Sequence, residues 1–217
     1  MERRIAKVLG VLLSAVFIIS LASASFAADD FKKYGVRIRG IYIMPDERFD
    51  GAFRAATEGL IGKTVIDDAV TPELDLEYFV TKNFSAELVL ALSKHDIMFS
   101  NGGVNGGSLW LLPPSLFVKY HPMPDNCYVS PYVGFGMNVV MPFDEKLTVG
   151  GANVPFKVES SVGWAAKVGA DIPIAKNVYL NLDAMYYNTE TKMNIGGTKF
   201  NLDINPFILG TGIGVRF

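Results

Sequence analysis

The sequence predicts an all-β fold, an eight-stranded antiparallel transmembrane β-barrel. Three observations support this prediction. Hydrophobic residues alternate with polar or small ones in several segments of about ten residues, the connections between these segments are alternately short and long, and the apolar face of the segments lacks charges. Alternation, rather than a long apolar run, is the sequence pattern of a membrane barrel, because successive side chains of a strand point to opposite faces of the sheet.

The first 27 residues are expected to be a cleaved signal peptide, followed by a barrel over residues 28–217. Basic residues, among them Arg3 and Lys7, precede the almost wholly apolar stretch Val8–Leu21. Small residues then flank Phe26 in Ser25–Ala27, where a signal peptidase would cleave. The apolar stretch is shorter than the roughly 20 residues that a spanning helix needs, which argues against a membrane anchor.

Composition and charge narrow the function classes further. The chain has 20 basic and 22 acidic residues, and it becomes more acidic once the expected signal peptide is removed. This balance argues against a nucleic-acid partner, because such a partner favours a basic face. The single cysteine, Cys127, cannot form an internal disulfide. An exported domain of this kind must gain its stability from a large core or from closure within a membrane.

The alternation places the strands in order along the chain. They are expected at about Lys32–Met44, Glu73–Val80, Phe84–Ser93, Leu109–Tyr120, Pro131–Val139, Val162–Asp171, Val178–Tyr187 and Phe207–Phe217. The apolar face consists of the even-numbered residues of 74–80, 84–92, 162–170 and 178–186, and of the odd-numbered residues of 131–139 and 207–217. Period-two alternation of this kind is typical of strands with two unlike faces. Only Phe53–Leu60 fits a short helix.

Connection lengths favour a membrane barrel over a soluble one. Residues 81–83, 122–126 and 175–177 form short turns, whereas residues 45–70, 96–108 and 142–158 form long connections. The last connection, near 194–198, is short but joins strands that extend further. Short turns on one side, long loops on the other and both termini on the short side are typical of outer-membrane barrels.

The face opposite the apolar one carries charges of both signs. Its expected members are Arg37, Arg39, Asp75, Glu77, Glu87, Lys119, Lys167, Asp171, Asp183 and Arg216. A soluble barrel would turn this face outward, and periodicity alone does not decide between the two arrangements. Gly134 and Gly212, on the same face, suit the narrow, filled interior of an eight-stranded membrane barrel. We therefore expect the charges to pair within the lumen, mostly toward the periplasmic half, and to block free solute flow there.

The C-terminal residue, Phe217, falls on the lipid-facing register. It is expected to join an aromatic girdle with Phe79, Tyr120 and Tyr179 on the short-turn side. A terminal aromatic residue on an outward-facing last strand is also what the outer-membrane assembly machinery is expected to recognise.

Catalytic, metal and cofactor sites are not expected. The chain has two histidines, of which His95 lies on the long-loop side and His121 on the short-turn side. An apolar band of about 25 Å would separate them, so they are not expected to share a site. Gly210-Thr211-Gly212 superficially matches a nucleotide-binding loop but lacks a following helix.

Four segments resemble the OmpW family of outer-membrane proteins. They are Leu112–Leu116, Pro131–Asn138, Gly163–Asp171 and Asn205–Phe217, which follow one another in the family's order. The first long connection does not match, and Val215 stands where the family has a tyrosine. The resemblance implies an eight-stranded barrel in the Gram-negative outer membrane, with an apolar extracellular cavity that passes small hydrophobic compounds sideways through its wall. It also implies a stress-related role and, in some bacteria, a role as a toxin or phage receptor.

The segment Leu112, Pro113 and Pro114 is the expected lateral exit. Neither proline has an N–H to donate to a neighbouring strand, so pairing should loosen there. Trp110, Leu111, Leu112, Val140 and Met141 are expected to guide the solute. An equally weighted alternative is that the prolines only shape the barrel, since strand irregularities also serve curvature.

Two function classes follow from these observations. The first is a passive channel for small apolar solutes, surrounded by outer-membrane lipid. The second is a non-conducting structural or receptor barrel whose extracellular loops bind partners. The sequence identifies neither the natural solute nor the loop partners.

Overall fold

The computed structural model describes residues 31–49, 51–55, 64–99, 106–124 and 128–217. The expected signal peptide (residues 1–27), residues 56–60 of the expected helix and residues 125–126 of the expected turn lie outside the described residues. Residues 51–55 form a short helical segment, which overlaps the expected helix at residues 53–55.

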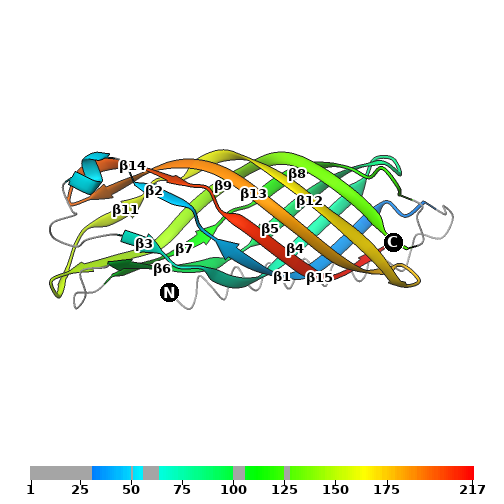
Figure 1. Ribbon diagram of the computed structural model, residues 1–217, viewed down its shortest axis with the longest axis horizontal. Coiled ribbons are helices and arrows are strands. Elements are labelled where there is room, and N and C mark those ends of the chain that lie inside the picture. Colours follow the sequence, from blue (N-terminus) through cyan, green and yellow to red (C-terminus); the bar gives the residue numbers. More distant parts are fainter. Residues whose placement is uncertain (1–30, 50, 56–63, 100–105, 125–127) are drawn as a thin grey trace.

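Eight strands pair in a closed antiparallel ring, which confirms the predicted fold class (Figure 1). In ring order they are β1 (Tyr34–Met44), β4 (Ala69–Phe79), β5 (Phe84–Ala91), β8 (Ser115–Tyr120), β9 (Ser130–Val149), β12 (Ser161–Ala175), β13 (Val178–Ile195) and β15 (Phe207–Arg216). β15 pairs with β1 and so closes the ring. Closure is required in a membrane because an open edge would leave backbone groups without partners, each costing several kcal/mol.

Shorter strands extend the ring at one end. They are β2 (Glu47–Phe49), β3 (Thr64–Ile66), β6 (Ser93–Phe99), β7 (Gly107–Leu112), β10 (Ala152–Asn153), β11 (Phe156–Val158) and β14 (Thr198–Ile204). Three of the breaks fall at prolines: Pro45 separates β1 from β2, Pro113–Pro114 separate β7 from β8, and Pro206 separates β14 from β15. The single strand expected over Leu109–Tyr120 is therefore two strands, because consecutive prolines cannot donate hydrogen bonds to a neighbour.

Short turns lie at the opposite end of the barrel, as predicted. Residues 80–83 connect β4 to β5, and Lys176–Asn177 connect β12 to β13. Asn177 has a φ of 68°, the left-handed conformation that Asn tolerates in tight turns. Figure 1 shows the C-terminus at this end, where the backbones of Tyr34 and Phe217 exchange hydrogen bonds of 3.0 and 2.8 Å.

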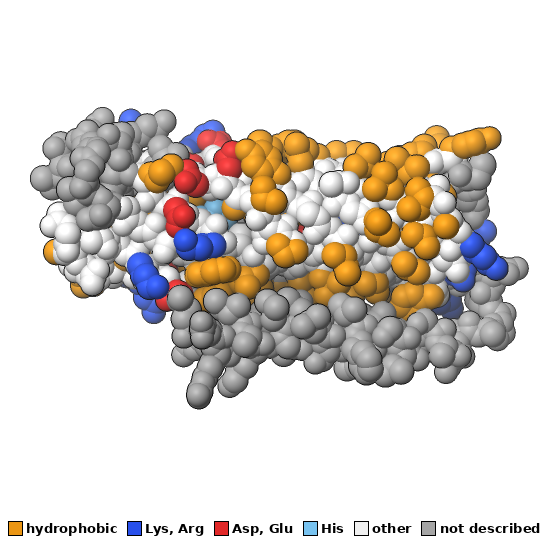
Figure 2. Space-filling view, turned by 90° about the horizontal axis from the view of Figure 1, so that it is seen from below, with side chains coloured by type: hydrophobic (Ala, Val, Ile, Leu, Met, Phe, Trp, Pro, Cys, Tyr) orange, Lys and Arg blue, Asp and Glu red, His pale blue; other side chains and the backbone are white. Residues whose placement is uncertain are grey.

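The outer surface of the ring is apolar and its interior is polar, as predicted. Phe135, Val168 and Ile213 are each more than half exposed on the outside, whereas Arg39 and Lys167 are buried inside. Figure 2 shows hydrophobic side chains along the outside and a group of charged side chains beyond them toward one end. Among the described residues no helix is long and apolar enough to cross a membrane.

The expected aromatic girdle is partly wrong. Tyr120 is exposed on the outside, but Phe79 and Tyr179 are buried in the lumen. The reason is the period-two alternation, which gives Phe79 the same direction as the inward-facing Asp75 and Glu77. Both buried rings contact the guanidinium of Arg216, whose central carbon lies 4.5 Å from the ring centre of Phe79 and 4.9 Å from that of Tyr179.

The outward face predicts how charge substitutions affect stability. Val168→Arg, in the middle of β12, should lower the free energy of unfolding by about 2–4 kcal/mol, because an arginine at the membrane midplane is costly. Val70→Arg, at the loop-side end of β4, should cost at most about 1 kcal/mol because the charge reaches the interface. Urea unfolding in lipid vesicles measures both values. Equal costs at the two positions would contradict this placement of the membrane.

Candidate functional site

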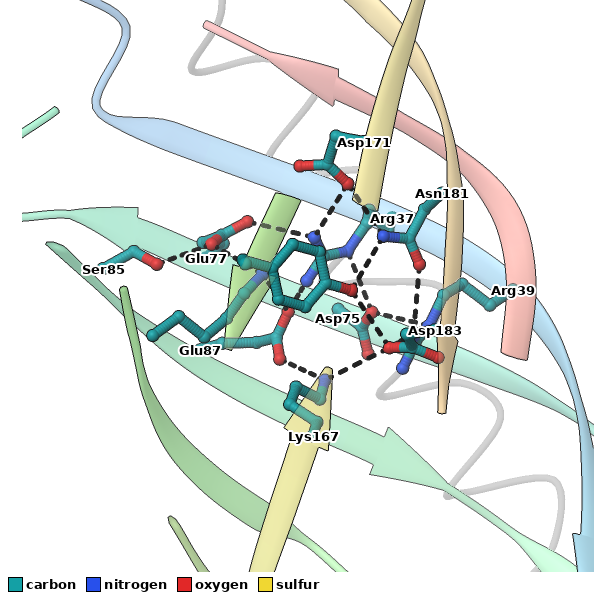
Figure 3. A network of polar contacts seen from close by, with 12 residues as sticks. Arg37, Arg39, Asp75, Glu77, Ser85, Glu87, Lys167, Asp171, Asn181 and Asp183 are labelled. Carbon is teal, nitrogen blue, oxygen red and sulfur yellow. Dashed lines mark hydrogen bonds and ion pairs between the residues drawn. The ribbon is translucent and has the colours of Figure 1, made fainter. Parts of the chain in front are cut away.

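Arg37 lies at the centre of a cluster of charged side chains in the lumen (Figure 3). Its guanidinium nitrogens lie 3.1 Å from Asp75, 3.2 Å from Glu77 and 3.7 Å from Asp171, and they also contact Glu87. Arg37 is 1% exposed, and its partners come from three different strands, β4, β5 and β12. This arginine therefore ties three parts of the wall together across the interior.

Arg39 forms a second centre one inward position further along β1. Its Nε lies 2.8 Å from Asp75, and its terminal nitrogens contact Glu73 and Asp183. Glu73 was not among the expected lumen charges, although its odd number places it on the inward face of β4 with Asp75.

Two lysines pair with the same carboxylates from the other side of the lumen. Lys119 Nζ lies 2.9 Å from Glu77 and 3.1 Å from Glu87, and it sits 3.8 Å from the centre of the Tyr132 ring. Lys167 contacts Glu87 and lies 3.6 Å from Asp183. Glu87 is therefore shared by Arg37 and both lysines.

Neutral groups join these ions into one network. Asn181 donates hydrogen bonds of 2.7 Å to Asp171 and 2.9 Å to the hydroxyl of Tyr132, which in turn donates to Asp183 at 3.1 Å. At the short-turn end, Ser85 donates to Glu77 at 2.6 Å and lies 3.1 Å from His121 Nε2. These neutral members could not be predicted, because single Asn, Tyr and Ser side chains carry no distinctive sequence pattern.

All ten expected lumen charges thus lie in one cluster, toward the short-turn end of the barrel. We call these ten residues and Glu73 the ionic plug. Arg216 joins it through Asp171, 2.5 Å away. The lumen around the plug is full: a Cβ on Gly214 would lie 2.3 Å from the ring of Tyr179 and 2.5 Å from Arg37 Cγ. Only glycine fits there, and the side chains of the plug pack closely against one another at this level.

An apolar cavity lies above the plug. This inner cavity, of about 60 Å³, is lined by Ile43, Pro45, Ile66, Ser93, His95, Leu109, Leu111, Pro113, Asn138, Val140, Val158, Ser161, Tyr187, Thr189, Thr191, Ile204, Pro206 and Ile208. An outer cavity of about 130 Å³ shares Ile66, Leu109, Val158 and Ile204 with it and is otherwise lined mainly by residues of the extracellular extensions, such as Phe49, Leu147 and Met193. The shared lining places the two apolar cavities next to each other.

His95 forms part of the wall of the inner cavity. Burial lowers the pKa of His95 below its usual value, so the ring is neutral at neutral pH. Its Nδ1 lies 3.1 Å from the backbone carbonyl oxygen of Asp67, which can only accept, so Nδ1 carries the proton. Nε2 then accepts from Ser93 at 3.0 Å. His121 lies beside the plug, and no group of three metal-ligating side chains occurs in the part of the chain that the structure describes.

The strand ladder is interrupted beside this cavity. The β5–β8 pairing ends at Val89 and Ser115, and the β6–β7 pairing resumes only at Ser93 and Leu111. Residues 112–114 therefore face residues 90–92 without ladder pairing among the described strands, while Pro114 still accepts a hydrogen bond from Val139 on β9 at 3.0 Å. Of the expected exit residues, Pro113 lines the inner cavity, and Leu112 and Pro114 are half-buried beside it.

The expected guide residues divide between the two faces of the wall. Leu111 and Val140 line the inner cavity. Trp110 instead stacks on Phe143, with ring centres 6.4 Å apart, and Met141 is exposed. The alternation of side chains along each strand explains why neighbouring residues of one expected set lie on opposite faces.

A family model matches residues 33–217, and its description is the OmpW family. The chain belongs to the OmpW family. It is 30% identical to an uncharacterised outer-membrane protein, y4mB, of Sinorhizobium fredii over 84% of this chain and 79% of that protein. It is 28% identical to outer membrane protein W of Vibrio cholerae over 91% of this chain and 94% of that one. These relatives place the chain in the Gram-negative outer membrane.

Solved structures share the fold. The crystal structure of OprG from Pseudomonas aeruginosa superposes with a TM-score of 0.67 at 22% identity, over 86% of this chain and 96% of that chain. The solid-state NMR structure of AlkL in lipid bilayers gives a TM-score of 0.63 at 20% identity, over 89% and 93% of the two chains. At such identities the likeness concerns the barrel architecture.

The plug predicts a large cost for removing its shared carboxylate. Glu87→Gln should lower the free energy of unfolding by about 3–5 kcal/mol, because it leaves Arg37 and two lysines buried with too few partners. Adding Lys167→Met should recover part of this loss by removing one of the uncompensated charges. Lys199→Ala, which breaks an exposed ion pair with Glu159, should leave stability almost unchanged. Urea unfolding in lipid vesicles tests the series, and a neutral Glu87→Gln would contradict the assigned network.

Proposed function

We propose that this protein is a passive outer-membrane channel for small hydrophobic molecules, which leave the barrel sideways through its wall. The observation that carries this proposal is the pair of adjoining apolar cavities, which lie between the extracellular extensions and the ionic plug. A solute that enters from outside cannot continue along the axis, because the charges below it are buried and paired. It must therefore leave through the wall or return.

The wall offers an exit at the level of the inner cavity. Leu112, Pro113 and Pro114 interrupt the ladder where the inner cavity ends, and Pro113 contributes directly to the cavity lining. Separating strands costs the hydrogen bonds between them, and that cost is lowest where two consecutive residues have no N–H. The interrupted ladder thus supports a lateral exit into the lipid at this position.

The route to the membrane completes the proposal. Residues 1–27 serve as the export signal, and Phe217 serves as the recognition signal for the outer-membrane assembly machinery. Phe217 stacks on Tyr34, with ring centres 6.1 Å apart, and remains partly exposed at the periplasmic end of the last strand. An exposed terminal aromatic residue of this kind is available to a recognition partner before the ring closes.

Restoring two N–H groups to the exit should slow transport. The double variant Pro113→Val with Pro114→Thr should take up an alkane-like solute several-fold more slowly than the wild type, because it can complete the ladder between β7–β8 and β5–β6. Uptake into proteoliposomes, compared with protein-free ones, measures this effect.

Pro72→Val is the matched control. Pro72 also lies within a strand, opposite Gly40, but its side chain faces outward and does not line either cavity. Its variant should transport normally. Wild-type uptake no faster than that of protein-free vesicles would overturn the channel and favour a non-conducting receptor or structural barrel. Unchanged uptake in a correctly folded double variant would overturn the lateral exit alone.

A further inference from the structure

Most polar side chains around the inner cavity already have partners within the protein. Ser93 and His95 bond to each other, and Thr191 donates to the backbone carbonyl of Glu159 at 2.6 Å. The hydroxyl of Tyr187 lies 3.1 Å from that of Ser115 and donates to it, because the single Ser115 hydroxyl hydrogen goes to the carbonyl oxygen of Pro113. These groups are satisfied without a solute, so they add little to its recognition.

Asn138 differs from these groups. Its side chain is fully buried, and its Nδ2 donates to Thr189 Oγ1 at 3.0 Å. Its Oδ1 has no hydrogen-bond partner. Gly163 lies opposite Asn138 in the ladder, and a Cβ there would come within 2.7 Å of this oxygen. Asn138 thus has a buried hydrogen-bond acceptor without a partner, and it lines the inner cavity.

A second unused group lies next to the first. Ser161 Oγ also has no partner, and Ser161 lines the same cavity on the neighbouring strand β12. In the β9–β12 ladder Ser161 pairs with Val140, two residues from Asn138, so the two polar side chains are diagonal neighbours on the inner face. A buried polar group without a partner costs roughly 1–3 kcal/mol, so two together in an apolar wall indicate a binding function.

We propose that Asn138 and Ser161 bind the polar end of the transported molecule, and that the preferred solute is an apolar body carrying one hydroxyl, such as a medium-chain alcohol. The hydroxyl donates to Asn138 Oδ1 and exchanges a second hydrogen bond with Ser161, while the hydrocarbon part contacts the apolar lining. This inference rests on the proposed channel and names its substrate class.

The position of the two groups connects binding with release. Asn138 pairs with Ser115 at the point where the β8–β9 ladder stops, and Ser115 itself donates to the carbonyl of Pro113 at 3.1 Å. The polar end of the solute is therefore held beside the exit residues, at the floor of the cavity. In a molecule bound in this way, the polar end lies beside the interrupted ladder and the hydrocarbon end points toward the outer cavity.

Three solutes of similar size separate the hydrogen bond from hydrophobicity: octanol, its methyl ether and nonane. The ether can accept a hydrogen bond but cannot donate one. Affinity for the barrel in amphipol is measured by headspace partition, and transport by uptake into proteoliposomes. The wild-type protein should bind octanol about fivefold more tightly than the ether, after the binding of each solute to amphipol alone is subtracted. This factor is the one expected for one neutral hydrogen bond.

Asn138→Leu should abolish this preference while still binding nonane, and Ser161→Ala should reduce it. Ser130→Ala is the matched control, since Ser130 on β9 also has an unpartnered, buried hydroxyl but lines neither cavity. Folding is checked by heat-modifiable migration on gels, and Ser161→Ala carries the test if Asn138→Leu fails to fold.

The outcomes distinguish this inference from the channel itself. Wild-type protein that takes up all three solutes equally, with no change in either cavity variant, would overturn the hydroxyl preference and leave the channel standing. Loss of the preference in Ser130→Ala as well would also overturn it, because the effect would then not depend on the cavity. Wild-type protein that accelerates none of the solutes would overturn the channel.

Discussion

Within the hydrocarbon layer, every backbone N–H and C=O must find a partner in the chain itself, and the rest of this structure follows from that constraint. The pairing of β15 with β1 meets it by closing the ring. An eight-stranded ring encloses room for little more than side chains. The inward positions must therefore be filled, and the chain fills them with charges of both signs that stabilise one another. Arg37, with four carboxylates around it, shows how completely the wall is cross-linked from inside.

The same constraint is relaxed beyond the apolar belt, where water can satisfy the backbone. Exposed charges such as Lys94, Asp96 and Lys199 mark this level on the outside. Strands there are interrupted by prolines, and the interior changes from ionic to apolar. A tight lower barrel and a looser upper one thus arise from the same chain, because the cost of an unpaired backbone group differs between lipid and water. The interrupted ladder at Pro113–Pro114 lies close to this boundary. Unpaired backbone groups there cost less free energy than they would at the membrane midplane.

Period-two alternation predicted the strands, their two unlike faces and the ten charges of the plug, and the connection lengths together with the glycines predicted which face points inward. The same alternation also places Glu73 and Phe79 in the lumen, because both are odd-numbered like the inward-facing Asp75. The prolines alone indicated that pairing would weaken within Leu109–Tyr120. That this segment forms two separate strands became clear only from the pairing with β5 and β6 on either side of the break. Which carboxylate meets which cation depends on the stagger of the strands around the ring, and no local pattern records that stagger.

The unused oxygen of Asn138 illustrates the limit of sequence reasoning most clearly. In the sequence, Asn138 cannot be distinguished from Asn181, because both lie at inward-facing positions of alternating strands. The side chain of Asn181, however, forms hydrogen bonds within the plug. The difference lies in the neighbours: Asn181 faces Asp171 and Tyr132, whereas Asn138 has only Thr189 for its amide nitrogen and the cavity on its other side. The proposed recognition point, Asn138, thus lies in the apolar part of the lumen above the ionic plug, next to Ser115, where the β8–β9 ladder stops.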